Sequence, residues 1–257
     1  MQWAPARSVA GPDVQHFRTT RFMSVSQFDS PLVIRTKLYP PRSREGLLVR
    51  DRLIEKLRQG GRCCLTLVSA PAGYGKTTLL QHWLSTLERR HAWLSIDEYD
   101  DSLTTFVAYL TAAVQTVYPE ALPQTRAIAL SSAPPEAGQL ADVMAGETER
   151  LPGPLILVLD DYHAVRVPEI HAFMNRLLEH LPPGVQLVVS SRTDPPFALA
   201  GLRGQGQLVE IRGRHLRFTR EESADLLQRF TGDRLADPIV ALVAERTEGW
   251  PVGLQLA

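Results

Sequence analysis

The sequence has few cysteines, no excess of either charge and no long hydrophobic run. Its 257 residues include 28 Lys and Arg and 28 Asp and Glu, so the formal net charge is zero. A neutral chain has no overall basic field to draw it to DNA or to anionic lipid, so any partner must be recognised locally. No apolar run is long enough to span a bilayer, and the N-terminal stretch lacks the apolar core of a signal peptide. These absences predict a cytoplasmic protein.

The two cysteines, Cys63 and Cys64, are neighbours in the chain. A pair of adjacent cysteines excludes a disulfide framework. They fall in a segment that we interpret as a strand, where their side chains would point to opposite faces. We therefore interpret them as two small, buried apolar residues rather than as a redox or metal site.

Strand-like and helix-like segments alternate along most of the chain. Four apolar segments are typical of buried strands: "CCLTLVSA", "AWLSI", "LILVLDD" and "VQLVVSS". A fifth strand is predicted at "QLVEI". The segments between them carry helical periodicity, as in "VPEIHAFMNRLLEHL". Alternation of this kind predicts an α/β fold, with a parallel sheet between two layers of helices.

The pattern changes at both ends of this α/β region. Residues 1–30 mix polar residues, Pro and Gly without periodicity, and we expect a disordered leader there. After Arg212 only helical patterns follow; Thr219 and Glu222 form a capping box, and Asp237 is expected to cap a later helix. The predicted divisions are therefore residues 1–30, an α/β domain over 31–212, and a partial helical subdomain over 213–257. Because the last residues resemble the start of another helix, we expect a fragment or a truncated product.

A glycine-rich loop follows the first predicted strand. It matches the phosphate-loop pattern G-x-x-x-x-G-K-[ST], except that alanine stands at the first glycine position. Alanine fits there if φ is negative, and the two remaining glycines still let the backbone wrap a phosphate. Backbone N–H groups, a lysine charge and a threonine hydroxyl would then hold the phosphates and Mg²⁺. A glycine-rich turn with a surface lysine is the alternative interpretation. The predicted nucleotide-binding residues are Ala70, Pro71, Gly73, Tyr74, Gly75, Lys76, Thr77 and Thr78.

Charged residues follow two further predicted strands. Asp160 and Asp161 end "LILVLDD", where a second metal support for a phosphate loop is expected. We assign Asp160, with Thr77, to Mg²⁺, and Asp161 to the orientation of the attacking water, because no Glu follows Asp160. Arg192 follows "VVSS" at the edge where α/β folds bind ligands, and could contact the γ-phosphate. Loop solubility, helix capping or an ordinary ion pair would also explain these residues.

Several stretches together resemble the nucleotide-binding domain of the MalT-like regulators, the large ATP-binding members of the LuxR group within the STAND class of signalling ATPases. The resemblance runs from about Leu38 to the end of the chain. The matching stretches are "KLYPPR", "LVRDRLIEKL", "SAPAGYGKTTL", "AWLSIDEYDDSLTTFVAYLTAAVQ", "LVLDDYH", "LVVSSRTDPP", "LRFTREES" and "EGWPVGLQLA".

The resemblance implies a function and further site residues. Val49 and Arg50 would border adenine, and Pro251 would pack on the base from the helical subdomain. Lys76, Asp161 and Arg192 would act in catalysis. ATP or ADP and Mg²⁺ would be the cofactors, and self-association is expected in the ATP state. The sensor and the DNA reader that follow in such regulators do not fit in this chain, so direct DNA binding is not expected.

Three hypotheses remain open, and the first two are of different classes. In the first, ADP holds a closed state, exchange to ATP allows self-assembly, and slow hydrolysis resets the switch. In the second, the chain is an AAA+-type or metabolic ATPase or phosphotransferase whose output is the chemistry itself. A nucleotide-binding remnant without regulatory output is a third. Under any of them, Lys76→Ala is expected to abolish nucleotide binding without harming the fold, because Lys76 is expected to face solvent.

Overall fold

A computed structural model describes residues 33–42, 48–61, 63–100, 102–131 and 135–256. The predicted leader, residues 1–30, lies outside them. Five strands form one sheet in the order β2-β3-β4-β1-β5, and all neighbouring strands run parallel. This confirms the predicted α/β fold, including the fifth strand. The strands are β1 (Leu65–Ser69), β2 (His91–Ser95), β3 (Leu155–Asp160), β4 (Val185–Ser191) and β5 (Leu208–Arg212).

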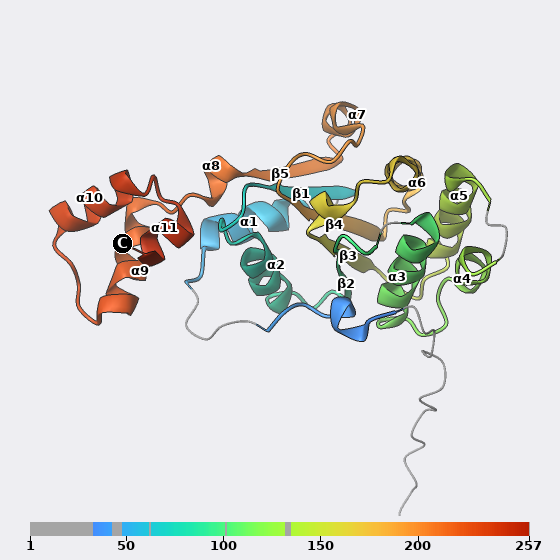
Figure 1. The fold of residues 1–257 in the computed structure, drawn as a ribbon, viewed down its shortest axis with the longest axis horizontal. Coiled ribbons are helices and arrows are strands. Elements are labelled where there is room, and N and C mark those ends of the chain that lie inside the picture. Colours follow the sequence, from blue (N-terminus) through green and yellow to red (C-terminus); the bar gives the residue numbers. More distant parts are fainter. Residues whose placement is uncertain (1–32, 43–47, 62, 101, 132–134, 257) are drawn as a thin grey trace, which may run out of the picture. The chain divides into compact units, whose positions relative to one another are not determined.

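The sheet separates two hydrophobic cores, because successive side chains of a strand point to opposite faces. In β3, Leu155, Leu157 and Leu159 join one core, and Ile156 and Val158 join the other. The first core is shared with α3 (Leu103–Gln115), α4 (Pro123–Ala129), α5 (Ala137–Thr148) and α6 (Pro168–His180). The second is shared with α1 (Asp51–Gln59) and α2 (Lys76–Ser85). Figure 1 shows the sheet with these helices around it. The predicted three-layer arrangement is therefore confirmed.

Short elements complete the α/β region. They are the 3-10 helices η2 (Arg35–Leu38) and η3 (Tyr162–Ala164), the helix α7 (Leu199–Gly204), and α8 (Gly213–Leu216) directly after β5. The apolar stripe predicted for α6 is buried as expected, with Ile170, Phe173 and Leu177 almost inaccessible.

After β5 the described chain is helical. The helices α9 (Arg220–Thr231), α10 (Asp237–Arg246) and α11 (Pro251–Leu256) lie together in Figure 1. The capping box predicted for α9 is present: the Thr219 hydroxyl accepts from the Glu222 amide, and the Glu222 carboxylate accepts from the Thr219 amide. The division between 31–212 and 213–257 stays our working proposal. Among the described helices, none has the length and apolar character needed to cross a bilayer.

Two local expectations are wrong. Cys63 and Cys64 precede β1 and are half-buried, and their thiols donate to the carbonyls of Gly206 and Gln207. The strand begins later because its ladder with β5 starts at Leu65. Asp237 is the first residue of α10 and not its cap, which is Ala236, whose carbonyl accepts from the amide of Val240.

The strand register brings the predicted site residues to one edge of the sheet. Ser69 pairs with Ser191 of β4 and with Arg212 of β5, and Asp160 ends the neighbouring β3. Because parallel strands end together, the loops after β1, β3 and β4 all emerge at this edge.

Candidate nucleotide-binding site

The loop between β1 and α2 has the backbone that a phosphate loop requires. Gly73 and Gly75 have φ of 78° and 73°, which side chains rarely tolerate. Ala70 is not among the described residues with positive φ, so its methyl group is compatible with the first position of the motif. Gly75 caps α2, whose first residues are Lys76, Thr77 and Thr78. The backbone amides at this helix start form an anion site.

The expectation that Lys76 faces solvent is wrong. Its side chain is buried, with 7% of the residue exposed, and its ammonium donates to the carbonyls of Ala70 (2.8 Å) and Pro71 (3.1 Å). The two carbonyls at the start of the loop thus accept from the lysine at its end. Burial lowers the pKa of Lys76, while the carboxylates of Asp161 and Asp160 act in the opposite direction. The charge is thus held inside the loop.

Thr77 and Asp160, the two residues assigned to Mg²⁺, are hydrogen-bonded to each other. The Thr77 hydroxyl donates to Asp160 Oδ2 at 2.9 Å, and the Ser190 hydroxyl of β4 donates to Oδ1. Burial raises the pKa of Asp160, and the hydrogen bonds from Ser190 and Thr77 only partly offset it. Hard oxygen ligands at one point suit Mg²⁺, which retains waters and nucleotide oxygens as its other ligands. The described residues contain no cluster of three or more His, Cys, Asp or Glu side chains that could hold a metal ion.

Asp161 and Arg192 follow β3 and β4 at the same edge of the sheet. Asp161 follows β3 in the left-handed region, with φ of 59°, and its side chain is 48% exposed. Arg192 follows β4 and is exposed. The positive charge of Arg192 lowers the pKa of Lys76, so the two cations face the same region. Two cations and two carboxylates therefore converge at the carboxyl edge of the sheet.

His163 belongs to the same cluster. The only sequence signal for it was its position shortly after Asp160 and Asp161. Its Nδ1 is buried, has no hydrogen-bond partner among the described residues, and lies 3.7 Å from Asp161 Oδ1. Burial lowers the pKa of His163, Asp161 opposes that effect, and Arg192 and Lys76 reinforce it. The imidazole is therefore neutral at pH 7 and close to all three charges.

The proposed adenine-bordering segment is attached to the helical subdomain. Val49 is exposed, whereas the guanidinium of Arg50 donates to the carbonyls of Leu216 (2.8 Å) and Arg217 (2.7 Å) and stacks on the Phe218 ring at 4.3 Å. The side chain of Arg50 thus contacts residues 216–222 and does not point into an open cavity.

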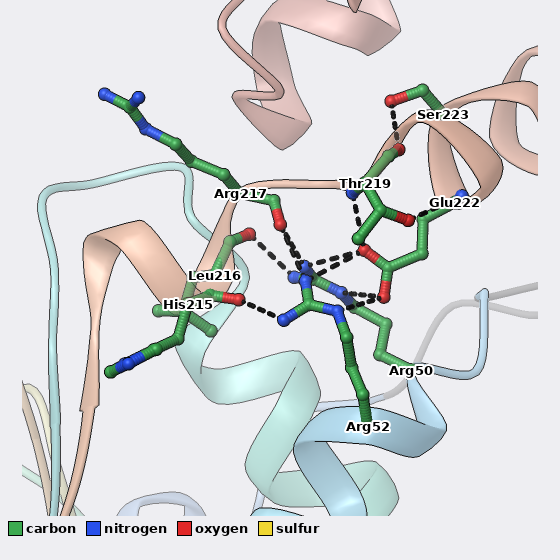
Figure 2. A network of polar contacts seen from close by, with 8 residues as sticks. All are labelled: Arg50, Arg52, His215, Leu216, Arg217, Thr219, Glu222 and Ser223. Atoms are coloured by element: carbon green, nitrogen blue, oxygen red, sulfur yellow. Dashed lines mark hydrogen bonds and ion pairs between the residues drawn. The ribbon is translucent and has the colours of Figure 1, made fainter.

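Arg52 and Glu222 complete this contact, and their pairing was not predicted from the sequence. Both Arg50 and Arg52 reach the Glu222 carboxylate, at 3.1 and 3.0 Å, and Arg52 also donates to the carbonyls of His215 and Arg217 (Figure 2). Burial alone would raise the pKa of Glu222, but the two arginines hold it below its ordinary value. We call Arg50, Arg52 and Glu222 the arginine clamp. The capping box was the only sequence signal for it.

The residues on either side of Pro251 in the sequence lie at the phosphate loop. Pro251 is buried and begins α11. A Cβ placed on Gly73 would meet Val252 Cγ2 at 2.9 Å and Trp250 Nε1 at 3.0 Å, so the start of α11 packs directly on the loop. Gly249, with φ of 67°, leaves no room for a side chain, because its Cβ would lie 2.5 Å from the Phe218 carbonyl oxygen.

Comparison with known proteins adds two kinds of relative. A family model described as an AAA ATPase domain matches residues 44–190. The chain is also 34% identical over 229 residues to proteins named HTH-type transcriptional regulator MalT, from Yersinia pestis (strain Pestoides F) and Yersinia enterocolitica serotype O:8. These alignments cover 88% of this chain and 25% of each relative. The chain thus spans about a quarter of the length of the curated relatives it matches.

Solved structures with a similar chain path were also found. Cdc6p from Pyrobaculum aerophilum aligns with a TM-score of 0.48 and 17% identity, over 82% of this chain and 58% of that one. RuvB from Thermotoga maritima aligns with a TM-score of 0.44 and 16% identity, over 84% of this chain and 63% of that one.

Proposed function

The chain belongs to the AAA ATPase domain family, and we propose that it is the nucleotide-binding switch domain of a MalT-like transcriptional regulator. The family implies nucleotide binding. In the proposal the ligands are ATP and ADP with Mg²⁺, and the output is a change of conformation and of self-association rather than a released product.

One observation carries the proposal: the start of α11 lies on the phosphate loop. Trp250 and Val252 are in van der Waals contact distance of Gly73, in the middle of the loop. Any movement of this loop on binding or losing a γ-phosphate must therefore move α11 or break its contact with the loop. Nucleotide state and the position of the helical subdomain are coupled by packing, which resists continuous deformation.

The arginine clamp supports the proposal at a second point. It joins the segment expected to border adenine, at Val49 and Arg50, to the cap of α9 through Glu222. The helical subdomain is thus attached to the α/β domain at the base-side segment and at the phosphate loop.

Each site residue has a proposed role. Lys76 stabilises the β- and γ-phosphates, and Thr77 with Asp160 would hold Mg²⁺, which neutralises phosphate charge when bound. Asp161 orients the attacking water, with neutral His163 beside it. Arg192 contacts the γ-phosphate. Pro251 packs against the base. The absence of a Glu after Asp160 supports slow hydrolysis, which fits a switch.

The test is a measurement of size and turnover in each nucleotide state. Purified protein is loaded with ADP or with a slowly hydrolysed ATP analogue, both with Mg²⁺, and examined by sedimentation velocity; ATP turnover is measured in parallel. The proposal expects a monomer with ADP, assemblies with the analogue, and turnover well below 1 per second, compared with about 1–100 per second for enzymes whose output is phosphoryl transfer. Rapid turnover without any change in size would contradict it and favour the enzyme hypothesis.

A further inference from the structure

A basic hollow lies beside β5, the strand at one end of the sheet. It has a volume of about 710 Å³ and includes side chains from α1, α7, β5 and α8. Four cations line it, with one carboxylate among the described lining residues: Lys56, Arg203, Arg212, Arg214 and Glu210. Since the chain as a whole is neutral, this concentration of positive charge is local.

Much of this charge has no internal counterion. Glu210 is shared by Arg203 and Arg212, and Arg212 also pairs with Asp194. Arg214 has no carboxylate partner among the described residues. Among the described residues, only His215 Nε2 lies within hydrogen-bond distance of the Lys56 ammonium, at 3.2 Å. Burial and the surrounding cations lower the pKa of His215, with Lys56 and Arg214 the largest of the charges. An anionic partner would relieve this repulsion.

An acidic turn projects from the opposite end of the same sheet. Residues 97–100 follow β2, which lies at the end of the strand order away from β5. Lys37 pairs with Asp97 and Asp100, both at 2.8 Å. With Glu98 the turn carries three carboxylates, and this one ammonium balances them only in part. Glu98 is exposed without an ion-pair partner among the described residues, and Tyr99 is 82% exposed.

This acidic turn is pre-formed. The Asp97 amide donates to the Asp100 carboxylate at 3.0 Å, and the Tyr99 amide donates to the Asp97 carboxylate at 3.0 Å. Because these bonds order the turn before any partner binds, little conformational entropy would be lost on docking. A large exposed aromatic residue next to an unpaired carboxylate also has the composition of an interface anchor.

We propose that the basic hollow receives the acidic turn of a second copy of this chain. The proposal rests on the self-assembly of the proposed function and names its contact surface. Because two different surfaces meet and they lie at opposite ends of one sheet, the contact is head-to-tail, and a pair of copies keeps one free basic hollow and one free acidic turn. Such a contact builds rings or open filaments rather than a closed pair.

The helix α8 connects this surface to the nucleotide site. Arg214 and His215 of α8 line the hollow, whereas Gly213 lies against the phosphate loop, with its Cβ position 3.8 Å from Ala70 Cβ and from Tyr74 Cε1. The carbonyls of His215 and Leu216 are held by the arginine clamp. Movement of the phosphate loop or of the clamp would therefore move the basic surface, which explains how nucleotide exchange controls docking.

A charge swap tests the interface. Arg214→Glu, Glu98→Lys and the double variant are compared with the full chain by sedimentation velocity, with ADP and with the ATP analogue. Arg150→Glu is the matched control, because it makes the same charge change at an exposed arginine outside both surfaces. Circular dichroism and ADP affinity check that each variant folds. Each single variant is expected to weaken assembly about tenfold or more, since like charges would then face each other, and the double variant to restore it.

The outcomes separate the interface from the switch. If the wild-type chain binds both nucleotides but has the same size with each, both the proposed nucleotide switch and the proposed interface are wrong. If the wild-type chain assembles and Arg214→Glu behaves like Arg150→Glu, the switch stands and the interface is wrong. If Arg214→Glu reduces binding to duplex DNA and leaves assembly unchanged, the hollow is a nucleic-acid surface and the interface is also wrong.

Discussion

Trp250 lies against Gly73, so close that a methyl group on the glycine would meet the indole Nε1 at 3.0 Å. The contact joins the phosphate loop to α11 across 177 positions of sequence. Gly73 is therefore required for two reasons: its φ of 78° and the lack of space beside it.

Gly73→Ala is expected to loosen the helical subdomain. Alanine would strain the left-handed backbone by about 1–2 kcal/mol and would also push against Trp250 and Val252. Trp250 fluorescence and limited proteolysis of α11 measure the release. Gly75→Ala is the matched control, because Gly75 has φ of 73° but no atom within 4 Å of its Cβ position. Equal release in both variants would show that backbone strain alone is responsible.

Lys76→Met is expected to weaken nucleotide binding about 10- to 150-fold, since a charge-assisted hydrogen bond contributes about 1.5–3 kcal/mol. It should also lower the Tm of the nucleotide-free protein, because the Ala70 and Pro71 carbonyls lose their donor. Methionine retains the apolar stem of the side chain. Calorimetric titration with ADP and a thermal melt give the two values, and an unchanged ADP affinity would contradict the site assignment.

Asp160→Asn should separate stability from function. The raised pKa of Asp160 means that its ionised form is less favourable in the folded protein than in the unfolded chain, so ionisation at pH 7 costs stability. The neutral amide is expected to raise the Tm without nucleotide and to remove the Mg²⁺ dependence of ATP binding. The Tm is measured with and without Mg²⁺-ATP. A lower Tm in the absence of nucleotide would contradict the argument.

Glu222→Gln should weaken the arginine clamp and remove the contribution of Glu222 to the pH dependence of stability. Removing a charged partner from two arginines is expected to cost about 1.5–3 kcal/mol of stability at pH 7. Because the pKa of Glu222 is depressed in the folded protein, its contribution is fully present above the ordinary value of 4.5 and is lost as the pH falls through the lower folded value.

Urea titrations of both proteins between pH 7 and pH 3 measure this contribution. The difference in unfolding free energy between wild type and variant should shrink as the pH falls below about 4.5, and titration of other carboxyls, such as Glu210, cancels in that difference. A difference that stays constant over this range would show that Glu222 acts by packing and not by charge.

The sequence was a sufficient guide where the signal is local. Apolar runs predict β1, β3 and β4, because a parallel strand covered on both faces is apolar along most of its length. The glycines and Lys76 predict the phosphate loop for a similar reason, since only those residue types permit its backbone and charge. The helices α4 and α5 were not predicted individually, and the strand predicted over Cys63 and Cys64 began too early.

Relationships between distant segments were decided by the tertiary structure alone. The sequence located Lys76, Arg50 and Trp250 but not their surroundings: Lys76 is buried, Arg50 binds Glu222, and Trp250 packs on Gly73. Burial and pairing depend on which segments meet in space, and no residue carries that information by itself. The sequence by itself determined that this chain has a parallel sheet and a phosphate loop. Only the tertiary structure decided that α8 and the start of α11 pack against that loop, and that the arginine clamp holds α9 beside them, because these contacts join segments far apart in the sequence.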